Sequence, residues 1–305
     1  DPFDYVDNEA HNASIVMLEQ KMKSLPWEEL ETSEADLLAR FLNQTIILDG
    51  CTITFDRLHL MRAISKYGKA IAHARRMYQQ AVDKVKEQPW EMEISVDETE
   101  TPTSPLEHYL IVHELLRLGV DFVSLAPRFV GRFEKGVDYI GDLAIFEAEL
   151  AKHAAVQHHF GNYKLSIHSG SDKFTIYPMF AQHTHGKVHL KTAGTSYLEA
   201  LRVMAMREPD FFREIADFSA SHYETDRATY HVSGELDKVP ALDTLDDDNL
   251  TTWLDQFDAR QVLHVTYGSV LEVFGGRLLA RLDDYETDYE QVLKTHFIKH
   301  LQPFV

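Results

Sequence analysis

Cysteine, tryptophan and long apolar runs are scarce in this 305-residue sequence, which contains one cysteine (Cys51) and three tryptophans. A single cysteine excludes an intrachain disulfide and a multi-cysteine zinc site, and it favours a reducing compartment. No run approaches the roughly 20 apolar residues that a membrane helix needs, and we find no signal peptide. The sequence therefore predicts a cytoplasmic protein with no membrane partner.

Positive charge is also in short supply, since 30 Lys and Arg residues stand against 49 Asp and Glu residues, a formal net charge of −19. Nucleic acids and bilayer surfaces are themselves anionic, so this excess argues against both as partners. A few local cations still suffice to bind a small anionic substrate. Apolar residues make up 44% and charged residues 26% of the chain, which is typical of a globular protein.

Strand-like and helix-like segments alternate over most of the chain, which predicts βαβ units and a parallel sheet. The expected strands are 93–98, 122–128, 164–168, 188–192 and 262–267, and the expected helices are 57–86, 105–118, 142–160 and 196–206.

Each expected strand alternates apolar with polar residues, as Leu165 and Ile167 do with Ser166 and His168. Successive strand residues point to opposite faces of a sheet, so each strand has one polar face. Strands of a doubly wound open sheet are covered on both faces and read as unbroken apolar runs. We therefore predict an α/β fold, a (β/α)8 TIM-barrel-like one with its active site at the C-terminal strand ends. An antiparallel sheet with one wet face is the alternative.

The predicted organisation is a single α/β barrel-like catalytic domain over residues 1–305. Residues 1–50 are expected to form a helical insertion, 51–270 the strand–helix units and 271–305 the C-terminal helices. We count five or six strands instead of eight, and the chain opens with Asp1-Pro2 and no initiator methionine. We interpret the shortfall as missing N-terminal strands of a barrel that has extra N-terminal and C-terminal helices.

Carboxylates and histidines mark several predicted strands. Glu93 and Asp97 lie on one strand face, where carboxylates are costly unless they bind a cation, pair with a base or exchange protons. His168 and His189 come from neighbouring strands and are candidate metal ligands at one end of a barrel. A structural hydrogen bond is the alternative for each histidine. Other histidines, such as His153, are predicted to be solvated on a surface helix.

Small residues and cations follow both histidines, and such segments can present backbone N–H groups, hydroxyls and positive charge to an anion. The candidate substrate-binding residues are Arg128, Ser169, Ser171, Asp172, Lys173, Lys191, Thr192 and His264.

Six ordered motifs resemble the tagaturonate/fructuronate epimerase family, and the resemblance runs through essentially all of the chain. They are 95–102 (SVDETETP), 128–131 (RFVG), 134–139 (EKGVDY), 168–174 (HSGSDKF), 191–196 (KTAGTS) and 264–269 (HVTYGS).

The resemblance implies a metal-dependent, barrel-like hexuronate enzyme of bacterial sugar-acid catabolism, an isomerase. It implies that Glu93 is the second acid/base and that His168 and His189 are metal ligands. Asp97, on the same predicted strand face as Glu93, is the other candidate catalytic residue. Family members are longer at the N-terminus, and the resemblance implies that the additional part carries an Asp and a His that serve as base and ligand. Zinc, manganese, cobalt, nickel and iron all suit imidazole and carboxylate ligands.

The two ketouronates differ at a hydroxyl-bearing carbon β to the ketone, whose C–H is not acidic. Retro-aldol cleavage, rotation of the fragment and re-addition is therefore our mechanistic hypothesis. It needs a Lewis acid at the ketone oxygen and a carboxylate that takes and returns the hydroxyl proton. Arg128, Lys173 or Lys191 would hold the substrate carboxylate.

Two other functions use the same residue types. A metal-dependent aldolase or ketose isomerase acting on sugar acids differs only in which bond is left broken. A non-catalytic sugar-acid binding protein would keep the cations without needing Glu93 and His168. A glycosidase fits poorly, because it needs paired carboxylates rather than two histidines. The sequence leaves a homo-oligomer open.

Overall fold

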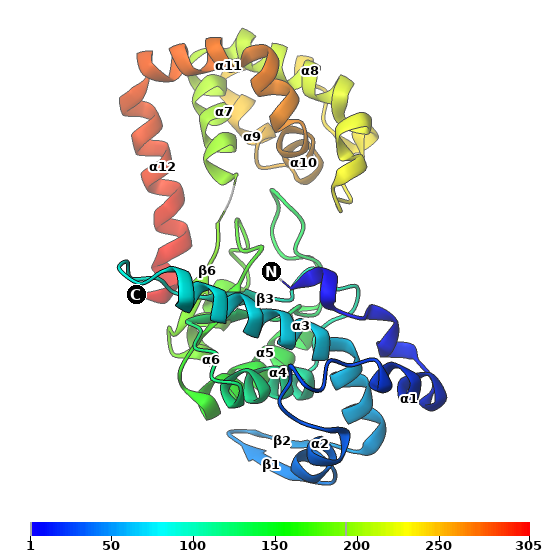
Figure 1. Cartoon of the computed structure of the whole chain (residues 1–305). Coiled ribbons are helices and arrows are strands. Elements are labelled where there is room, and N and C mark those ends of the chain that lie inside the picture. Colours follow the sequence, from blue (N-terminus) through cyan, green and yellow to red (C-terminus); the bar gives the residue numbers. More distant parts are fainter. Residues whose placement is uncertain (1, 193) are drawn as a thin grey trace. The chain divides into compact units, whose positions relative to one another are not determined.

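The computed structural model describes residues 2–192 and 194–305, so Asp1 and Ala193, which belongs to motif 191–196, lie outside it. The chain divides into two compact units, each described here by itself. Unit 1 comprises Asp1–Val130, Asp142–His168 and Met179–His189, and unit 2 comprises Gly131–Gly141, Ser169–Pro178 and Leu190–Val305 (Figure 1).

Unit 1 combines helices with a parallel sheet, which confirms the predicted α/β class. Its elements are the 3₁₀ helices η1 (Phe3–Tyr5) and η2 (Asn8–Asn12), α1 (Ile15–Lys23), α2 (Glu34–Phe41), β1 (Thr45–Leu48), β2 (Cys51–Thr54), α3 (Arg57–Lys84), β3 (Glu93–Ser95), α4 (Pro105–Arg117), β4 (Ser124–Ala126), α5 (Leu143–Phe160), β5 (Lys164–Ile167), and most of α6 (Tyr177–Thr184) and β6 (Val188–Leu190).

The sheet has the strand order β3-β4-β5-β6, and β4 pairs in parallel with both β3 and β5. Its register places Ile94 beside Leu125 and Leu125 beside Leu165, so one face of the three strands is apolar. On that face Ile94 and Leu125 belong to a buried cluster with Tyr67 of α3 and Leu115 of α4. This packing fixes the strands whose other face carries the predicted site residues.

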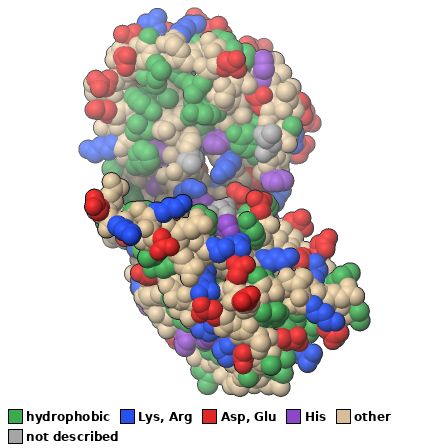
Figure 2. All heavy atoms as spheres, viewed as in Figure 1, with side chains coloured by type: hydrophobic (Ala, Val, Ile, Leu, Met, Phe, Trp, Pro, Cys, Tyr) green, Lys and Arg blue, Asp and Glu red, His purple; other side chains and the backbone are tan. Residues whose placement is uncertain are grey.

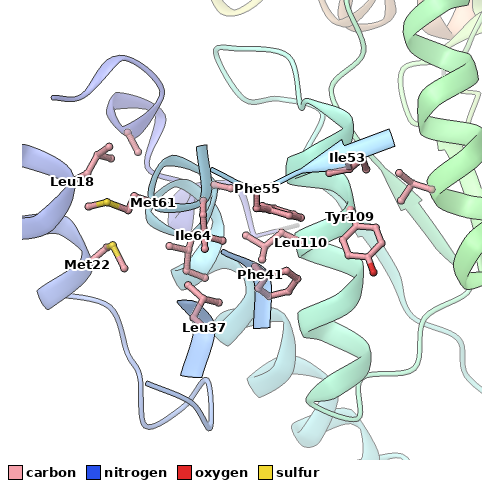
Figure 3. Close-up of a cluster of buried hydrophobic side chains, with 14 of the residues drawn as sticks. Leu18, Met22, Leu37, Phe41, Ile53, Phe55, Met61, Ile64, Tyr109 and Leu110 are labelled. Carbon is pink, nitrogen blue, oxygen red and sulfur yellow. The ribbon is translucent and has the colours of Figure 1, made fainter. Parts of the chain in front are cut away.

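Local signals set the helix starts. Asp56 accepts a hydrogen bond from the His59 N–H at the start of α3, and Ser104 forms a capping box with Glu107 ahead of Pro105 in α4. These contacts satisfy N–H groups that have no partner within the helix. A second core packs α1, α2, the β1–β2 hairpin, α3 and α4 together (Figure 3).

Unit 2 is helical after β6. Its elements are α7 (Thr195–Arg207), α8 (Pro209–Asp226), η3 (Arg227–Thr229), η4 (Leu236–Lys238), η5 (Leu242–Thr244), η6 (Asp247–Asn249), α9 (Leu250–Trp253), α10 (Phe257–Val265), α11 (Tyr267–Asp284), α12 (Glu286–Leu301) and η7 (Gln302–Phe304). Its core includes Leu201, Phe211, Trp253 and Leu263, which come from four different helices and are nearly or fully buried.

The predicted strand at 262–267 is wrong, because this segment is the end of α10 and the start of α11. Leu263 and Val265 alternate with polar residues, but Ala259, Val262 and Leu263 are buried at helical spacing. Gln256 accepts a hydrogen bond from the Ala259 N–H and starts the helix. The buried residues of α10 as a whole recur with the period of a helix, whereas residues 262–267 taken alone have the period of a strand.

Two further differences concern the ends of the predicted strand–helix region. The β1–β2 hairpin was not predicted, and β1 lies inside the expected helical insertion 1–50. Within the described residues the parallel sheet has four strands, fewer than the five or six counted from the sequence.

No helix of the described chain is long and apolar enough to cross a membrane. Charged side chains of both signs are interspersed over the visible face of the part that contains α3 (Figure 2).

Candidate functional site

The polar face of the unit 1 sheet holds two carboxylate–histidine pairs, which we call the strand-end pairs. His168, directly after β5, places Nδ1 3.2 Å from Oδ1 of Asp97, two residues after β3. His189 of β6 places Nε2 3.2 Å from Oε1 of Glu93, and its Nδ1 lies 3.0 Å from the Ser166 hydroxyl. The structure therefore joins the four predicted catalytic and metal-binding residues into two specific pairs.

Small hydroxyl side chains line the same sheet face. Ser95 lies two residues from Glu93, and Ser124 sits beside Glu93 in the register of β3 and β4, so their side chains share its face. Both serine hydroxyls are buried and have no hydrogen-bond partner among the described residues. Buried polar groups without partners are rare in proteins. Their presence here indicates a surface shaped for a polar ligand.

The residue types of the strand-end pairs suit a divalent ion, since imidazole and carboxylate are ordinary ligands of transition metals. The hydroxyl of Ser166 beside Nδ1 of His189 would orient that ring, as outer hydrogen bonds do for metal-bound histidines. The pairs are also open to solvent: side-chain exposure is 19% and 14% for His168 and Asp97, and 29% and 48% for His189 and Glu93.

Arg128 follows β4 and contacts the segment that carries Asp97. Its guanidinium donates to the carbonyl of Thr99, and its backbone N–H donates to the Thr103 hydroxyl at 3.1 Å. Lys66 of α3 supports the same segment through the Thr101 hydroxyl at 2.9 Å. Arg128 therefore holds the loop after β3 in place, and contact with a substrate stays a prediction.

His153 was predicted to be solvated, and this is wrong, because the side chain is 1% exposed. Its Nδ1 lies 3.0 Å from Nδ1 of His108, whose Nε2 accepts a hydrogen bond from the Tyr163 hydroxyl at 2.7 Å. Burial lowers the pKa of His153 to about 3 and that of His108 well below its ordinary value. The inward face of α5 could not be told from its outward face, because its apolar residues are spread around the helix.

Lys173 in unit 2 is bound by backbone carbonyls. Its Nζ donates to the carbonyls of Glu134 at 2.8 Å, Val137 at 2.6 Å and Ser171 at 2.9 Å. Burial lowers the pKa of Lys173 to about 8. As placed, this predicted substrate-binding residue fixes the loop 131–141 against the segment 169–173, and a substrate contact stays a prediction.

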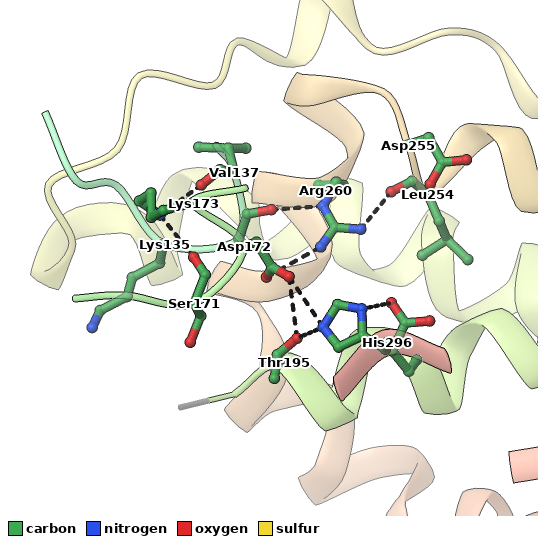
Figure 4. Close-up of polar contacts among 12 residues, drawn as sticks. Lys135, Val137, Ser171, Asp172, Lys173, Thr195, Leu254, Asp255, Arg260 and His296 are labelled. Carbon is green, nitrogen blue, oxygen red and sulfur yellow. Dashed lines mark hydrogen bonds and ion pairs between the residues drawn. The ribbon is translucent and has the colours of Figure 1, made fainter. Parts of the chain in front are cut away.

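Asp172 is the centre of a buried cluster in unit 2. Its Oδ2 lies 3.3 Å from Nη2 of Arg260, and its Oδ1 lies 3.1 Å from Nε2 of His296 (Figure 4). Oδ1 also accepts a hydrogen bond from the Thr195 hydroxyl at 3.3 Å. Burial by itself raises the pKa of Asp172, but the hydrogen bond from His296 and the charge of Arg260 lower it to about 2.

His300 completes this group, which we call the Asp172 cluster (Asp172, His296 and His300). Its Nε2 lies 3.8 Å from Oδ1 of Asp172 and accepts a hydrogen bond from the Asp172 N–H at 3.1 Å. One ligand atom from each residue lies within 4.8 Å of the other two, the one such group found among the described residues. His296 and His300 were not predicted as site residues, although two histidines spaced four residues apart on a helix are a usable signal of a metal site.

His264 joins three of the motifs within unit 2. A Cβ at Gly136 would lie 3.1 Å from Cβ of His264, and one at Gly194 would lie 2.7 Å from its Cε1. Burial lowers the pKa of His264 to about 4, and its Nδ1 is buried without a hydrogen-bond partner among the described residues. Motifs 134–139, 191–196 and 264–269 are therefore brought together by packing around this ring.

The remaining predicted substrate-binding residues lie on two neighbouring segments of unit 2. Ser169, Ser171 and Thr192 are partly buried, and Lys191 is exposed. The Gly170 N–H donates to the Lys191 carbonyl at 3.1 Å, which joins the two segments.

Comparison with known proteins gives consistent matches over the whole chain. A family model described as tagaturonate epimerase (UxaE) matches residues 1–304. A tagaturonate/fructuronate epimerase of Thermotoga maritima is 43% identical over 298 residues, which are 97% of this chain and 61% of the relative. The chain therefore spans about three fifths of that relative's length.

Solved structures agree with this. The fructuronate-tagaturonate epimerase UxaE of Cohnella laeviribosi, in a complex with one glycerol, matches with a TM-score of 0.92 and 39% identity over 100% of this chain and 62% of that one. The native crystal structure of the same enzyme matches with a TM-score of 0.92 and 38% identity, with the same coverage.

Proposed function

This chain belongs to the tagaturonate epimerase family, and on that premise we propose that it interconverts tagaturonate and fructuronate with the help of a divalent metal ion. The family model covers residues 1–304. The observation that carries the proposal is the pair of carboxylate–histidine contacts on one polar sheet face. A protein that only binds a sugar acid has no need of two such pairs.

We propose that the four-stranded sheet is part of a (β/α)8 barrel-like fold and that residues 1–305 contribute to a single catalytic domain. The apolar face of the sheet packs on helices, and the opposite face carries carboxylates, histidines and serines. A barrel interior with functional groups at the strand ends has this division. The parallel pairings of β4 with β3 and β5 support it.

Glu93 and Asp97 are the proposed acid/base residues. One carboxylate takes the proton of the substrate hydroxyl β to the ketone while the bond between the α and β carbons breaks, which leaves an aldehyde and an enediolate. The aldehyde rotates and presents its other face, the carbon–carbon bond forms again, and the carboxylate returns the proton. A carboxylate positioned in this way contributes about 10²–10⁴-fold to the rate.

His168 and His189 are the proposed ligands of the metal ion. When bound, the ion supplies Lewis acidity toward the ketone oxygen of the substrate. In this proposal Ser166 keeps the His189 ring in position through its contact with Nδ1. Zinc, manganese, cobalt, nickel and iron are all compatible with this donor set.

Substrate binding is proposed for the predicted cationic and hydroxyl-bearing residues. Exposed Lys191 is the strongest candidate for an ion pair with the substrate carboxylate, because Lys173 donates to three carbonyls. Arg128, Ser169, Ser171, Asp172, Thr192 and His264 complete the proposed set.

A conversion assay tests this function. Protein freed of metal by a chelator is given tagaturonate with single divalent ions, and fructuronate is followed by chromatography. We expect one or more ions to restore conversion, and we expect His168→Ala to abolish it. Glu93→Gln should lower the rate by about 10²–10⁴-fold, while Glu91→Gln, an exposed neighbour before β3, should leave it unchanged.

Three results would contradict parts of the proposal. Folded protein that converts nothing with any ion, even when it is extended at the N-terminus to the length of its relatives, would contradict the activity. Solvent deuterium on the epimerised carbon would contradict the retro-aldol route and favour direct proton exchange. Accumulation of free fragments in place of the epimer would indicate an aldolase.

A further inference from the structure

Two histidines on the C-terminal helix α12 face a carboxylate from a distant part of unit 2. His296 and His300 are four residues apart, which places them on one face of a helix, the arrangement that helical metal sites use. Asp172 approaches them from the segment that follows β5. All three residues are buried, with side-chain exposures of 7%, 1% and 4% for His296, His300 and Asp172.

An acceptor oxygen at the far side of each ring favours Nε2 as the ligand atom. Nδ1 of His300 lies 3.0 Å from the carbonyl of His296, which can only accept, so this nitrogen carries the proton and Nε2 keeps its lone pair. Nδ1 of His296 lies 3.4 Å from Oε1 of Glu199, another acceptor. A metal-bound histidine almost always has such a carbonyl or carboxylate partner on its other nitrogen.

Asp172 and its neighbour Glu199 each have one carboxylate oxygen paired with an arginine and the other facing a histidine. Arg260 lies beside Oδ2 of Asp172, which leaves Oδ1 toward the rings. Arg202 donates to Oε2 of Glu199 at 2.9 Å, and Oε1 faces Nδ1 of His296. The arginines thus fix both carboxylates and leave Oδ1 of Asp172 as the ligand oxygen.

The separations suit a small ion. Two ligand atoms bound about 2.0–2.1 Å from a tetrahedral zinc ion are about 3.4 Å apart. Oδ1 of Asp172 lies 3.1 Å from Nε2 of His296 and 3.8 Å from Nε2 of His300, which brackets this value. The Thr195 hydroxyl contacts both Oδ1 of Asp172 and Nε2 of His296, so a fourth oxygen is adjacent (Figure 4).

We propose that the Asp172 cluster binds one zinc-like divalent ion through Oδ1 of Asp172 and Nε2 of His296 and His300. Ion binding replaces the hydrogen bond from the Asp172 N–H to His300 with a ligand bond. Imidazole with a single carboxylate selects a late transition ion over calcium or magnesium, which prefer oxygen ligands. A cavity of about 250 Å³ borders the cluster on the side of His296 and is lined in part by Glu199.

The role of this ion is structural. All three ligand residues are buried. With the adjacent Thr195 hydroxyl as the fourth ligand, every position of a tetrahedral site would be filled by a protein group, which is the arrangement of structural sites. The ion would tie α12 to the segment 169–173, which Lys173 in turn ties to the loop 131–141. The inference does not depend on the proposed function, because ion binding is measured without any substrate.

Ion stoichiometry tests the proposal. The chelated 305-residue chain is dialysed against zinc, and bound metal per chain is measured by atomic emission. We expect the double variant His296→Gln/His300→Gln to bind one ion fewer than the unmodified chain, while His168→Ala keeps this ion. Glu199→Gln should weaken it by about 10–100-fold, and His231→Gln, an exposed histidine of the same unit, should change nothing.

A second measurement keeps the proposal testable if the double variant does not fold. Cobalt is added to the chelated His168→Ala variant, and the visible absorption of a four- or five-coordinate cobalt site with nitrogen and oxygen ligands is recorded. Its appearance at one equivalent supports the site. Absence of this absorption, or equal zinc stoichiometry in the folded double variant and the unmodified chain, overturns the proposal and leaves a purely hydrogen-bonded cluster.

Discussion

The strand-end pairs and the Asp172 cluster use the same residue types in opposite surroundings. In the strand-end pairs, side-chain exposure runs from 14% to 48%, whereas in the Asp172 cluster it runs from 1% to 7%. Exposed carboxylate–histidine contacts contribute little to stability and leave room for a ligand. Buried ones are strongly coupled to the fold. The difference teaches that burial, more than residue identity, separates a reacting group from a stabilising one.

The largest stability effect is expected at Asp172. Asp172→Asn leaves Arg260 buried beside a neutral amide, and breaking a buried ion pair from one side costs about 3–5 kcal/mol. We expect the free energy of unfolding, measured with urea in the presence of a chelator, to fall by that amount.

Two matched variants sharpen the comparison. Arg202 has a second carboxylate partner, Asp255, whose side chain is 65% exposed. Asp255→Asn removes this partner and should lower the free energy of unfolding by less than about 1 kcal/mol. Asp97→Asn in a strand-end pair should likewise change stability little while it lowers activity. Equal costs at Asp172 and Asp97 would break the distinction between the two groups.

The residues of the strand-end pairs could be predicted from the sequence because strand alternation fixes which side chains share a face. Glu93, Asp97, His168 and His189 all follow from a period of two. The pairing of Glu93 with His189 could not be predicted, because it depends on the order β3-β4-β5-β6. Strand order is a property of the packed sheet and is absent from any single segment.

The Asp172 cluster could not be assembled from the sequence for a different reason. Asp172 and His296 are separated by more than a hundred residues, and only the docking of α12 beside α7 brings them together. Residues 262–267 show the same limit on a smaller scale. They alternate like a strand, but they lie in helices because tertiary packing outweighs the local pattern. His264 was chosen for the site, but on the wrong element.

An intermediate effect on the free energy of unfolding is expected from the buried pair His108 and His153. This pair adds buried histidines without a carboxylate to the comparison. Burial lowers the pKa of His153 to about 3, so the folded chain keeps this ring neutral where the unfolded chain protonates it with a pKa near 6.5. Stability from this group is fully present above pH 6.5 and is lost as the pH falls toward 3. At pH 5 the loss is about 2 kcal/mol.

Urea unfolding at pH 8 and pH 5 measures this loss. His153→Gln removes the titrating ring and should reduce the difference between the two pH values by about 2 kcal/mol, while His11→Gln, an exposed histidine of the same unit, should leave it unchanged. An unaltered pH dependence in His153→Gln would show that the ring is protonated within the fold.

The smallest effect is expected at Gly194, where backbone and side-chain constraints meet beside the Asp172 cluster. Gly194 has φ +76°, and an added Cβ would lie 2.7 Å from Cε1 of His264. Gly194→Ala should therefore cost about 1–2 kcal/mol, since alanine is strained at positive φ and the ring must shift. Gly276→Ala in α11 has no atom within 4 Å of the new Cβ and should stabilise by up to about 1 kcal/mol. If both substitutions stabilise the chain, the backbone at Gly194 and its neighbours shift at little cost. The rigidity that we ascribe to the surroundings of Asp172 then does not extend to motif 191–196.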